Sequence, residues 1–467
     1  MTNFLARRRS ALASLAFAVI LIPVAACSTE TLLESEDPDL IDPSATRSEA
    51  GALGLRNGAL GRFRNITGGS ESTWLFGGLL ADEWSTSSTF IQNDETDQRR
   101  IQLNNSSITG MFRDLARVRT ATNQAIAAMK EFLPDSTGLI AELYFARGFA
   151  EMQLAQDFCN GIPLSDGSGE EIVFGMPLTI DSVFKVSIAS YDSALALAVL
   201  PGTRFDTIIN RAARVGKARA LLGIGRFAEA GALVTAAAVP TTYTYNHTFL
   251  VTSGSNILWS QPNSQRRYTV GDSLEGNSHN ILVQNALPFF SAKDPRLPVT
   301  YSVSSNGRDT TKGQDGFTFS RRTPLYGQTT PVAVVNGIDA RLIEAEAALK
   351  ANDPATMLAI LNALRAARPT IGTVTPAAGT LPPLVDPGTE AGRVDLLFRE
   401  KAFWTFTRGQ RLGDLRRLIR QYGRTPATTF PEGQHYRGGT YGPDVNLPVP
   451  FDELNNPNFA GCLNRDA

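Results

Sequence analysis

The sequence predicts an all-α fold in which pairs of helices form a repeat scaffold, with long irregular loop insertions and a few short strands. Two observations carry this prediction. Apolar residues recur at three-and-four spacing in neighbouring segments, and stretches rich in Ser, Thr, Asn, Gly and Pro separate those segments. Stacked helix pairs of this kind bury one continuous core. Four pairs are expected, over about residues 113–157, 187–238, 339–368 and 392–422.

The first pair shows how the helices are recognised. Residues 113–132 place Val118 and Met129 on one apolar stripe, as a helix packed on one face requires. Pro134 breaks the chain, and residues 137–157 continue the stripe in a second helix. We therefore expect two adjacent helices joined by a tight turn.

The second pair contains the most informative run. Small residues at Gly216, Ala220 and Gly223 allow two helices to approach closely, and the chain turns into a third helix at Gly225. This part of the sequence resembles a tetratricopeptide repeat. The resemblance implies that neighbouring pairs stack side by side.

The third and fourth pairs follow the same pattern. Asp353 fits the N-cap position of a helix and Pro354 fits its first turn, because aspartate accepts hydrogen bonds from free backbone N–H groups and proline lacks one. The last pair is expected over residues 392–407 and 411–422.

Three insertions are expected on a ligand-binding side of the scaffold. They cover about residues 84–105, 240–319 and 370–387 and are irregular, with short strands at most. Loops of this length are uncommon in compact proteins, and where they are ordered they usually serve a function. Binding is therefore expected on these loops.

The amino-terminal segment has the layout of an export signal. Three arginines at 7–9 precede an apolar stretch at 11–24, and small residues lead into Cys27. This lipobox is similar to that of bacterial lipoproteins, which implies that residues 1–26 are removed and that Cys27 carries the lipid (diacylglycerol, palmitate-type) anchor. An ordinary secretory signal is the alternative. Residues 27–47 form an acidic tether, and residues 48–467 form a single domain.

Two further cysteines remain in the exported chain. Cys159 and Cys462 lie in a compartment where disulfides persist, so they can pair. A buried free Cys159 is equally compatible with the sequence, because cysteine also serves as a small apolar side chain.

Charge and motif content exclude several functions. The chain has 44 Lys and Arg against 45 Asp and Glu, so no basic field indicates nucleic acid as a partner. The histidines 247, 279 and 435 stand apart, without metal-binding spacing, and no phosphate-binding loop is present. Gly271-Asp272-Ser273-Leu274 spells a hydrolase signature, but it lies mid-chain in a loop. No cofactor, metal or catalytic residue is expected.

Several separated segments resemble the SusD/RagB family in its own order along the chain. The most specific are Arg-Glu-Lys-Ala-Phe-Trp at 399–404 and the arginine-rich segment at 408–417. The others lie at 78–83, 141–149, 160–164, 294–296, 341–347, 361–365, 447–450 and 456–458. Gly413 departs from the family, which usually has an aromatic residue before the aspartate that follows.

The resemblance implies a function and partners. It implies a non-catalytic, solute-binding lipoprotein of the outer membrane that faces the cell exterior. Such a protein captures oligosaccharides and delivers them to a SusC-like, TonB-dependent transporter. The helix pairs would face that transporter. Two alternatives stay open: a helical-repeat interaction scaffold, or a subunit that binds peptide or protein nutrients.

The late motif is interpreted as structural. Spacings in its helices permit ion pairs between neighbouring turns and across helices. The expected pairs join Glu400 to Arg399, and Asp414 to the three arginines Arg411, Arg416 and Arg417.

Sugar recognition requires flat apolar faces for stacking and planar polar groups for hydroxyls. Two loop segments combine aromatic residues with amides and arginine. The candidate ligand-binding residues are Trp84, Phe90 and Asn93 in the first segment and Trp259, Arg266 and Tyr268 in the second.

Overall fold

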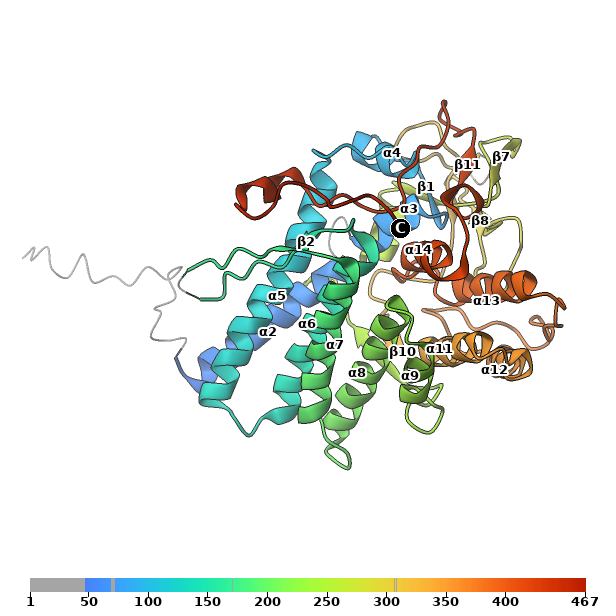
Figure 1. The fold of residues 1–467 in the computed structure, drawn as a ribbon. Coiled ribbons are helices and arrows are strands. Elements are labelled where there is room, and N and C mark those ends of the chain that lie inside the picture. Colours follow the sequence, from blue (N-terminus) through green and yellow to red (C-terminus); the bar gives the residue numbers. More distant parts are fainter. Residues whose placement is uncertain (1–46, 69–71, 170, 306, 308) are drawn as a thin grey trace, which may run out of the picture. The chain divides into compact units, whose positions relative to one another are not determined.

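A row of helices, each packed against the one before it, dominates the computed structural model, which describes residues 47–68, 72–169, 171–305, 307 and 309–467. Glu49–Ala467 form one compact unit. The row runs through α2 (Glu49–Gly68), α5 (Ser106–Phe132), α6 (Thr137–Asp157), α7 (Ile180–Leu197), α8 (Arg204–Gly223), α9 (Phe227–Leu233), α11 (Gly337–Lys350) and α12 (Pro354–Ala367) (Figure 1).

The helices lie where the apolar periodicity placed them; α6 starts at the predicted Thr137, whereas α7 and α8 start earlier than predicted. α7 begins at Ile180 because the Thr179 side chain accepts a hydrogen bond from the backbone N–H of Ser182. α8 begins with a capping box between Thr203 and Asp206. These polar caps precede the first apolar stripe residue, so periodicity alone predicts a start that is too late for these two helices.

The fourth pair differs from the others. α13 (Glu390–Trp404) packs against α11, whereas α14 (Arg411–Tyr422) packs against α6 and α3 (Thr73–Leu80). Side chains join α13 and α14, as in the edge-on contact between Phe398 and Tyr422. The two helices are therefore neighbours through side chains rather than a closely packed hairpin.

α2 is a helix that the sequence analysis did not find. Its glycines at 54, 58 and 61 lower helix propensity and weaken the apolar stripe. Buried Phe63 and Ile66 nevertheless attach it to the core, where it packs against α5. Tertiary packing has overridden local preference.

The strands are short, as expected, and antiparallel. β1 (Trp84–Thr86) pairs with β5 (Tyr268–Val270), and β4 (Thr244–His247) pairs with β10 (Val332–Asn336). β7 (Ile281–Gln284) lies between β6 (Leu274–Glu275) and β11 (Glu432–Gly433). β2 (Ile162–Pro163) pairs with β3 (Pro177–Leu178), and β8 (Thr300–Tyr301) with β9 (Arg321–Arg322). Figure 1 shows β1, β7, β8 and β11 gathered to one side of the helical row.

The segments expected to carry the export signal, the lipid on Cys27 and most of the acidic tether lie outside the described residues.

The two remaining cysteines form a disulfide. Cys159 follows α6, and Cys462 lies near the carboxyl end, with their Cα atoms 6.1 Å apart. The bond closes a loop of 303 residues. Because Leu463 N–H also donates to Asn160 O, the carboxyl-terminal segment is held against the end of α6.

Replacing both cysteines, Cys159→Ser/Cys462→Ser, is expected to lower the free energy of unfolding by about 2–5 kcal/mol, since an unfolded chain without the bond has more conformations. Chemical denaturation with and without reductant measures this. Reductant should destabilise the wild type by the same amount and leave the double variant unchanged. Equal stability of reduced and oxidised wild type would contradict the expectation.

The ion pairs of the late motif are buried, but their partners differ from those expected. Asp414 pairs with Arg417 at 2.7 Å, as predicted, and with Lys401 at 2.8 Å. Glu400 instead receives Arg296 and Arg365, each at 2.7 Å. Arg411 pairs with Asp82 instead of Asp414. Its Nε donates to Oδ1 at 2.6 Å, and its Nη2 donates to Oδ2 at 2.7 Å.

Two residues of this motif were wrongly predicted to form ion pairs. Arg399 lies 5.0 Å from the ring centroid of Phe403, and Arg416 donates to the backbone carbonyls of Ala155 and Gln156. The physical reason is helical geometry, because residues one or two positions apart do not face each other. Burial without a carboxylate partner lowers the pKa of Arg416 to about 9.

Glu83 is a buried carboxyl between the helices and the loops. Its Oε1 accepts a hydrogen bond of 2.8 Å from the Thr407 backbone N–H. Burial raises the pKa of Glu83 to about 8, and this hydrogen bond offsets the effect only in part. Glu83 is therefore largely protonated at neutral pH.

As pH rises, the variant Glu83→Gln is expected to lose less stability than the wild type. The folded protein keeps the Glu83 proton up to about pH 8, whereas the unfolded chain releases it near pH 4.5. The stability that this proton contributes is thus fully present below the unfolded pKa of 4.5, and it is lost as pH rises toward the folded pKa of about 8. Melting temperatures at about pH 5 and 8 for both proteins measure the difference. Parallel losses in wild type and variant would show that Glu83 is ionised when folded.

Candidate ligand-binding site

Four loop segments from distant parts of the chain meet beside β1 and β5. They are residues 87–90, 266–267, 313–318 and 435–437, and we call this cluster the loop surface. Backbone hydrogen bonds align the first three: Ser87 N–H donates to Arg267 O at 2.9 Å, and Gln314 N–H donates to Arg266 O at 2.9 Å. Asp315 N–H donates to Ser87 O at 3.0 Å. The loops therefore share one backbone framework.

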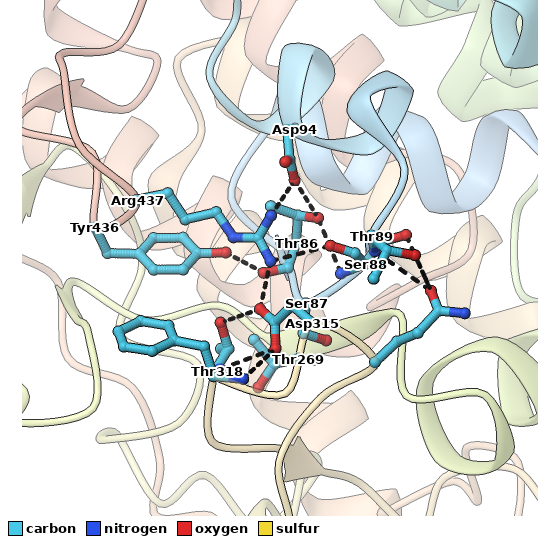
Figure 2. A network of polar contacts seen from close by, with 12 residues as sticks. Thr86, Ser87, Ser88, Thr89, Asp94, Thr269, Asp315, Thr318, Tyr436 and Arg437 are labelled. Carbon is cyan, nitrogen blue, oxygen red and sulfur yellow. Dashed lines mark hydrogen bonds and ion pairs between the residues drawn. The ribbon is translucent and has the colours of Figure 1, made fainter.

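Arg437 fastens the fourth segment to the others. Its guanidinium forms ion pairs with Asp94 at the start of α4 (Ile91–Asp97) and with Asp315, and it donates to Ser88 O at 3.0 Å. Figure 2 shows Arg437 lying between Asp94 and Asp315. The neighbouring Tyr436 hydroxyl donates to Thr86 O. One arginine thus bridges three loops.

The electrostatics of this bridge favour the charged forms of Arg437 and Asp315, but not that of Asp94. Burial disfavours the charge on Arg437, but Tyr436, Asp94 and Asp315 outweigh it and raise the guanidinium pKa above its ordinary value. Burial also acts to raise the pKa of Asp315, yet hydrogen bonds from Thr318 and nearby backbone N–H groups hold it below its ordinary value. Burial raises the pKa of Asp94. The bridge fixes the loops rather than offering a free charge.

Above this base the loop surface presents aromatic rings. Phe90 is 40% exposed and Phe317 is 59% exposed. The Arg267 guanidinium carbon lies 4.4 Å from the Phe90 ring centroid, so one face of that ring is covered by a cation and supported. Exposed aromatic rings held in place are suited to stacking on flat apolar faces.

Uncharged polar groups lie next to Phe90. The Gln314 Oε1 accepts from Ser88 Oγ, Thr89 N and Thr89 Oγ1, each at 3.4 Å. Hydrogen bonds this long are weak and exchange easily for bonds to a ligand. The loop surface therefore combines stacking faces with adjustable hydroxyl and amide groups.

Three of the predicted ligand-binding residues are not at this surface. Trp84 and Tyr268 are 2% and 0% exposed, and their rings contact each other edge to face in the β1–β5 pair. Asn93 is buried and donates to the Tyr268 hydroxyl at 2.9 Å. The prediction that these residues contact a ligand is wrong, because strand pairing buries Trp84 and Tyr268, and Asn93 lies buried on α4 against the Tyr268 hydroxyl. Their role is to support the loops.

The other three predicted residues have mixed positions. Phe90 lies on the loop surface as expected. Arg266 is half-buried with a left-handed backbone (φ 59°) and donates to Lys312 O at 3.3 Å. Trp259 ends α10 (Ile257–Trp259) and packs partly buried against the core. Of the six, Phe90 alone combines an aromatic face with broad exposure.

Phe317, Gln314 and Arg437 were missed by the sequence analysis. Asp315 and Gly316 form a turn signal that carries Phe317 outward, so this aromatic residue was detectable within the 240–319 insertion. Arg437 gives no local signal.

The Gly-Asp-Ser-Leu sequence does not form a nucleophile site. The His279 ring contacts Leu274 O through Nδ1 and the Tyr301 hydroxyl through Nε2. Among the described residues, Ser273 Oγ makes no hydrogen bond with this imidazole. The histidine is therefore not placed to accept the serine proton.

Comparison with known proteins gives matches to solved structures alone. No protein-family model matches the sequence, and no curated protein matches it. A SusD superfamily protein from Bacteroides vulgatus is 15% identical, with a TM-score of 0.63 over 90% of this chain and 99% of that chain. A SusD-like carbohydrate binding protein from Bacteroides fragilis is 13% identical, with a TM-score of 0.60 over 89% of this chain and 99% of that chain. NanU from B. fragilis is 14% identical, with a TM-score of 0.58 over 91% and 100% of the two chains. At such identities the likeness concerns the fold.

Proposed function

Because the chain has the SusD-like fold, we propose that it is a non-catalytic binding protein that captures oligosaccharides on the loop surface. The observation that carries the proposal is the exposed ring of Phe90 next to the uncharged Thr89 and Gln314, with a second exposed ring, Phe317, on the same loop surface. A pyranose ring has flat C–H faces for stacking and hydroxyls for hydrogen bonds, so it fits this combination.

The structural neighbours support the choice of ligand. One of the proteins with this fold is described as carbohydrate-binding. The charge pattern agrees, because the charged groups at the base of the loop surface are paired: Arg437 binds both Asp94 and Asp315. Because these side chains are already paired, the base of the loop surface suits an uncharged ligand.

The location and partner are further parts of the proposal. A lipid on Cys27 would anchor the chain in the outer membrane, facing the exterior, and the captured glycan would pass to a SusC-like, TonB-dependent transporter. In the part of the chain that the structure describes, no helix combines the length and apolarity needed to cross a bilayer. The lipobox supports the anchor.

A second surface supports the proposal that the chain binds a protein partner. The segment between β2 and β3 and the segment near the carboxyl end expose large apolar side chains, and Asn456 and Asn458 join the two segments by donating to Gly175 O and Phe174 O at 2.8 and 3.1 Å. We call this the arm surface; its apolar residues are Ile172, Val173, Phe174, Met176, Phe451 and Leu454. Exposed apolar clusters mark interaction sites. The arm surface also favours the second candidate function, an interaction scaffold.

A glycan array probed with residues 28–467, followed by calorimetry on the strongest ligand, tests the proposal. Saturable binding to one class of oligosaccharide is the expected result and names the substrate class. If no glycan binds, and the protein binds only peptides or a transporter, the scaffold function would replace glycan capture.

A further inference from the structure

A cavity of about 510 Å³ lies away from the loop surface, between the β4–β10 pair and the end of α12. None of its lining residues belongs to the loop surface. Its walls come from residues 241–246, 331–338 and 367–372, with Tyr326 and Arg408. The volume falls within the range of about 300–1,000 Å³ that small-molecule sites occupy.

The cavity is electrically neutral. Among the described residues of its lining, Arg408 alone is charged, and its Nη1 and Nη2 donate to the Asp339 carboxylate at 2.9 and 2.7 Å. The Arg408 Nε donates to Ala333 O at 3.0 Å. Because this charge is already paired, the cavity suits an uncharged ligand better than an ion.

Tyr326 brings an unused hydroxyl to this cavity. The residue is 4% exposed and lines the cavity; among the described residues no hydrogen bond of its hydroxyl is found, and the hydroxyl is not one of the fully buried polar atoms without a partner. A hydroxyl that lines a cavity and has no protein partner is available to a ligand, and one such hydrogen bond adds modestly to affinity. A ligand hydroxyl in the cavity would supply the missing bond.

Other polar groups in the lining are also uncommitted. Asn336 uses its Oδ1 to cap α11, which leaves its Nδ2 amide without a partner among the described residues. Thr241 and Thr242 bring hydroxyls, and Ile338 and Ile371 form apolar wall. Hydroxyl and amide groups over an apolar wall recognise polyhydroxylated molecules.

We propose that this cavity is a second binding site, for a small uncharged polyhydroxylated ligand of mono- or disaccharide size that hydrogen-bonds the Tyr326 hydroxyl. The site is independent of the loop surface, and it does not require that the loop surface bind glycans.

Ligand-observed NMR on the full chain tests the site, with glucose, galactose, maltose, cellobiose and N-acetylglucosamine as probes. At least one probe should bind saturably. Tyr326→Phe should weaken that binding by about five- to tenfold, the worth of one neutral hydrogen bond, without lowering the melting temperature.

Tyr243 offers a matched control in the same wall. Its hydroxyl donates to Ile208 O at 2.8 Å, so only its ring serves the cavity. Tyr243→Phe should lower the melting temperature and leave probe affinity unchanged, the reverse of Tyr326→Phe. A second variant, Ala367→Trp, places a bulky side chain at an exposed lining position and should abolish binding.

The loop-surface variant Phe90→Ala/Phe317→Ala separates this proposal from glycan capture. Binding in the cavity should persist in that variant. Absence of saturable binding by every probe would overturn the second site, as would binding that both Tyr326→Phe and Ala367→Trp leave unchanged.

Discussion

Replacing Glu400 by alanine is expected to lower the free energy of unfolding by about 3–5 kcal/mol, because it leaves buried guanidinium groups without their carboxylate. Glu400 is 2% exposed and receives Arg296 and Arg365 at 2.7 Å and the Trp404 indole N–H at 3.2 Å. Arg296 keeps Asp294 as a partner, but among the described residues Arg365 keeps only the backbone carbonyl of Pro382. Chemical denaturation measures the loss.

Asp395 on the same helix provides the matched control. It pairs with Arg424 at 2.6 Å, but its side chain is 65% exposed. Water competes for such a pair, so Asp395→Ala should cost less than about 1 kcal/mol. Similar losses for Glu400→Ala and Asp395→Ala would contradict the view that burial makes the Glu400 network essential to the fold.

The double variant Phe90→Ala/Phe317→Ala is expected to weaken glycan affinity at least about tenfold, because two stacking faces are lost and each is worth on the order of 1 kcal/mol. The melting temperature should change by no more than a few degrees, since exposed side chains contribute little to stability. Calorimetric titration with the strongest array ligand gives the affinity.

The arm surface supplies the control for this variant. Phe174 and Phe451 are 43% and 49% exposed, close to the exposure of the loop-surface rings. Phe174→Ala/Phe451→Ala removes the same chemistry from another place and should leave glycan affinity unchanged. If this control weakens binding as much as the loop-surface variant, the glycan does not stack at the loop surface.

The fold was predictable where local patterns decide it. The predicted helical-repeat architecture and the resemblance to SusD are confirmed at the level of fold. The start of α12 could be predicted from two residues. Asp353 caps the helix by accepting a hydrogen bond from Thr356 N–H, and the proline after it fits the first turn. α2 needed contacts with α5 to become a helix, so its glycine-rich sequence did not reveal it.

The candidate site was less predictable because its residues meet across long stretches of chain. Composition placed Trp84 and Tyr268 in loops, but burial depends on pairing between β1 and β5, which no local pattern encodes. Arg437 reaches Asp94 across 343 residues and Asp315 across 122. Two of the three predicted insertions supply segments of the loop surface, and one predicted residue, Phe90, is exposed there. Sequence patterns did not indicate residues 435–437 or the side chains that hold the segments together.

The crystal structure of the chain with its strongest array ligand tests glycan capture most directly. We expect a sugar ring stacked on Phe90 or Phe317, with its hydroxyls bonded to Gln314 and Thr89. A ligand seated only in the Tyr326 cavity or on the arm surface would contradict the assignment of the loop surface as the capture site.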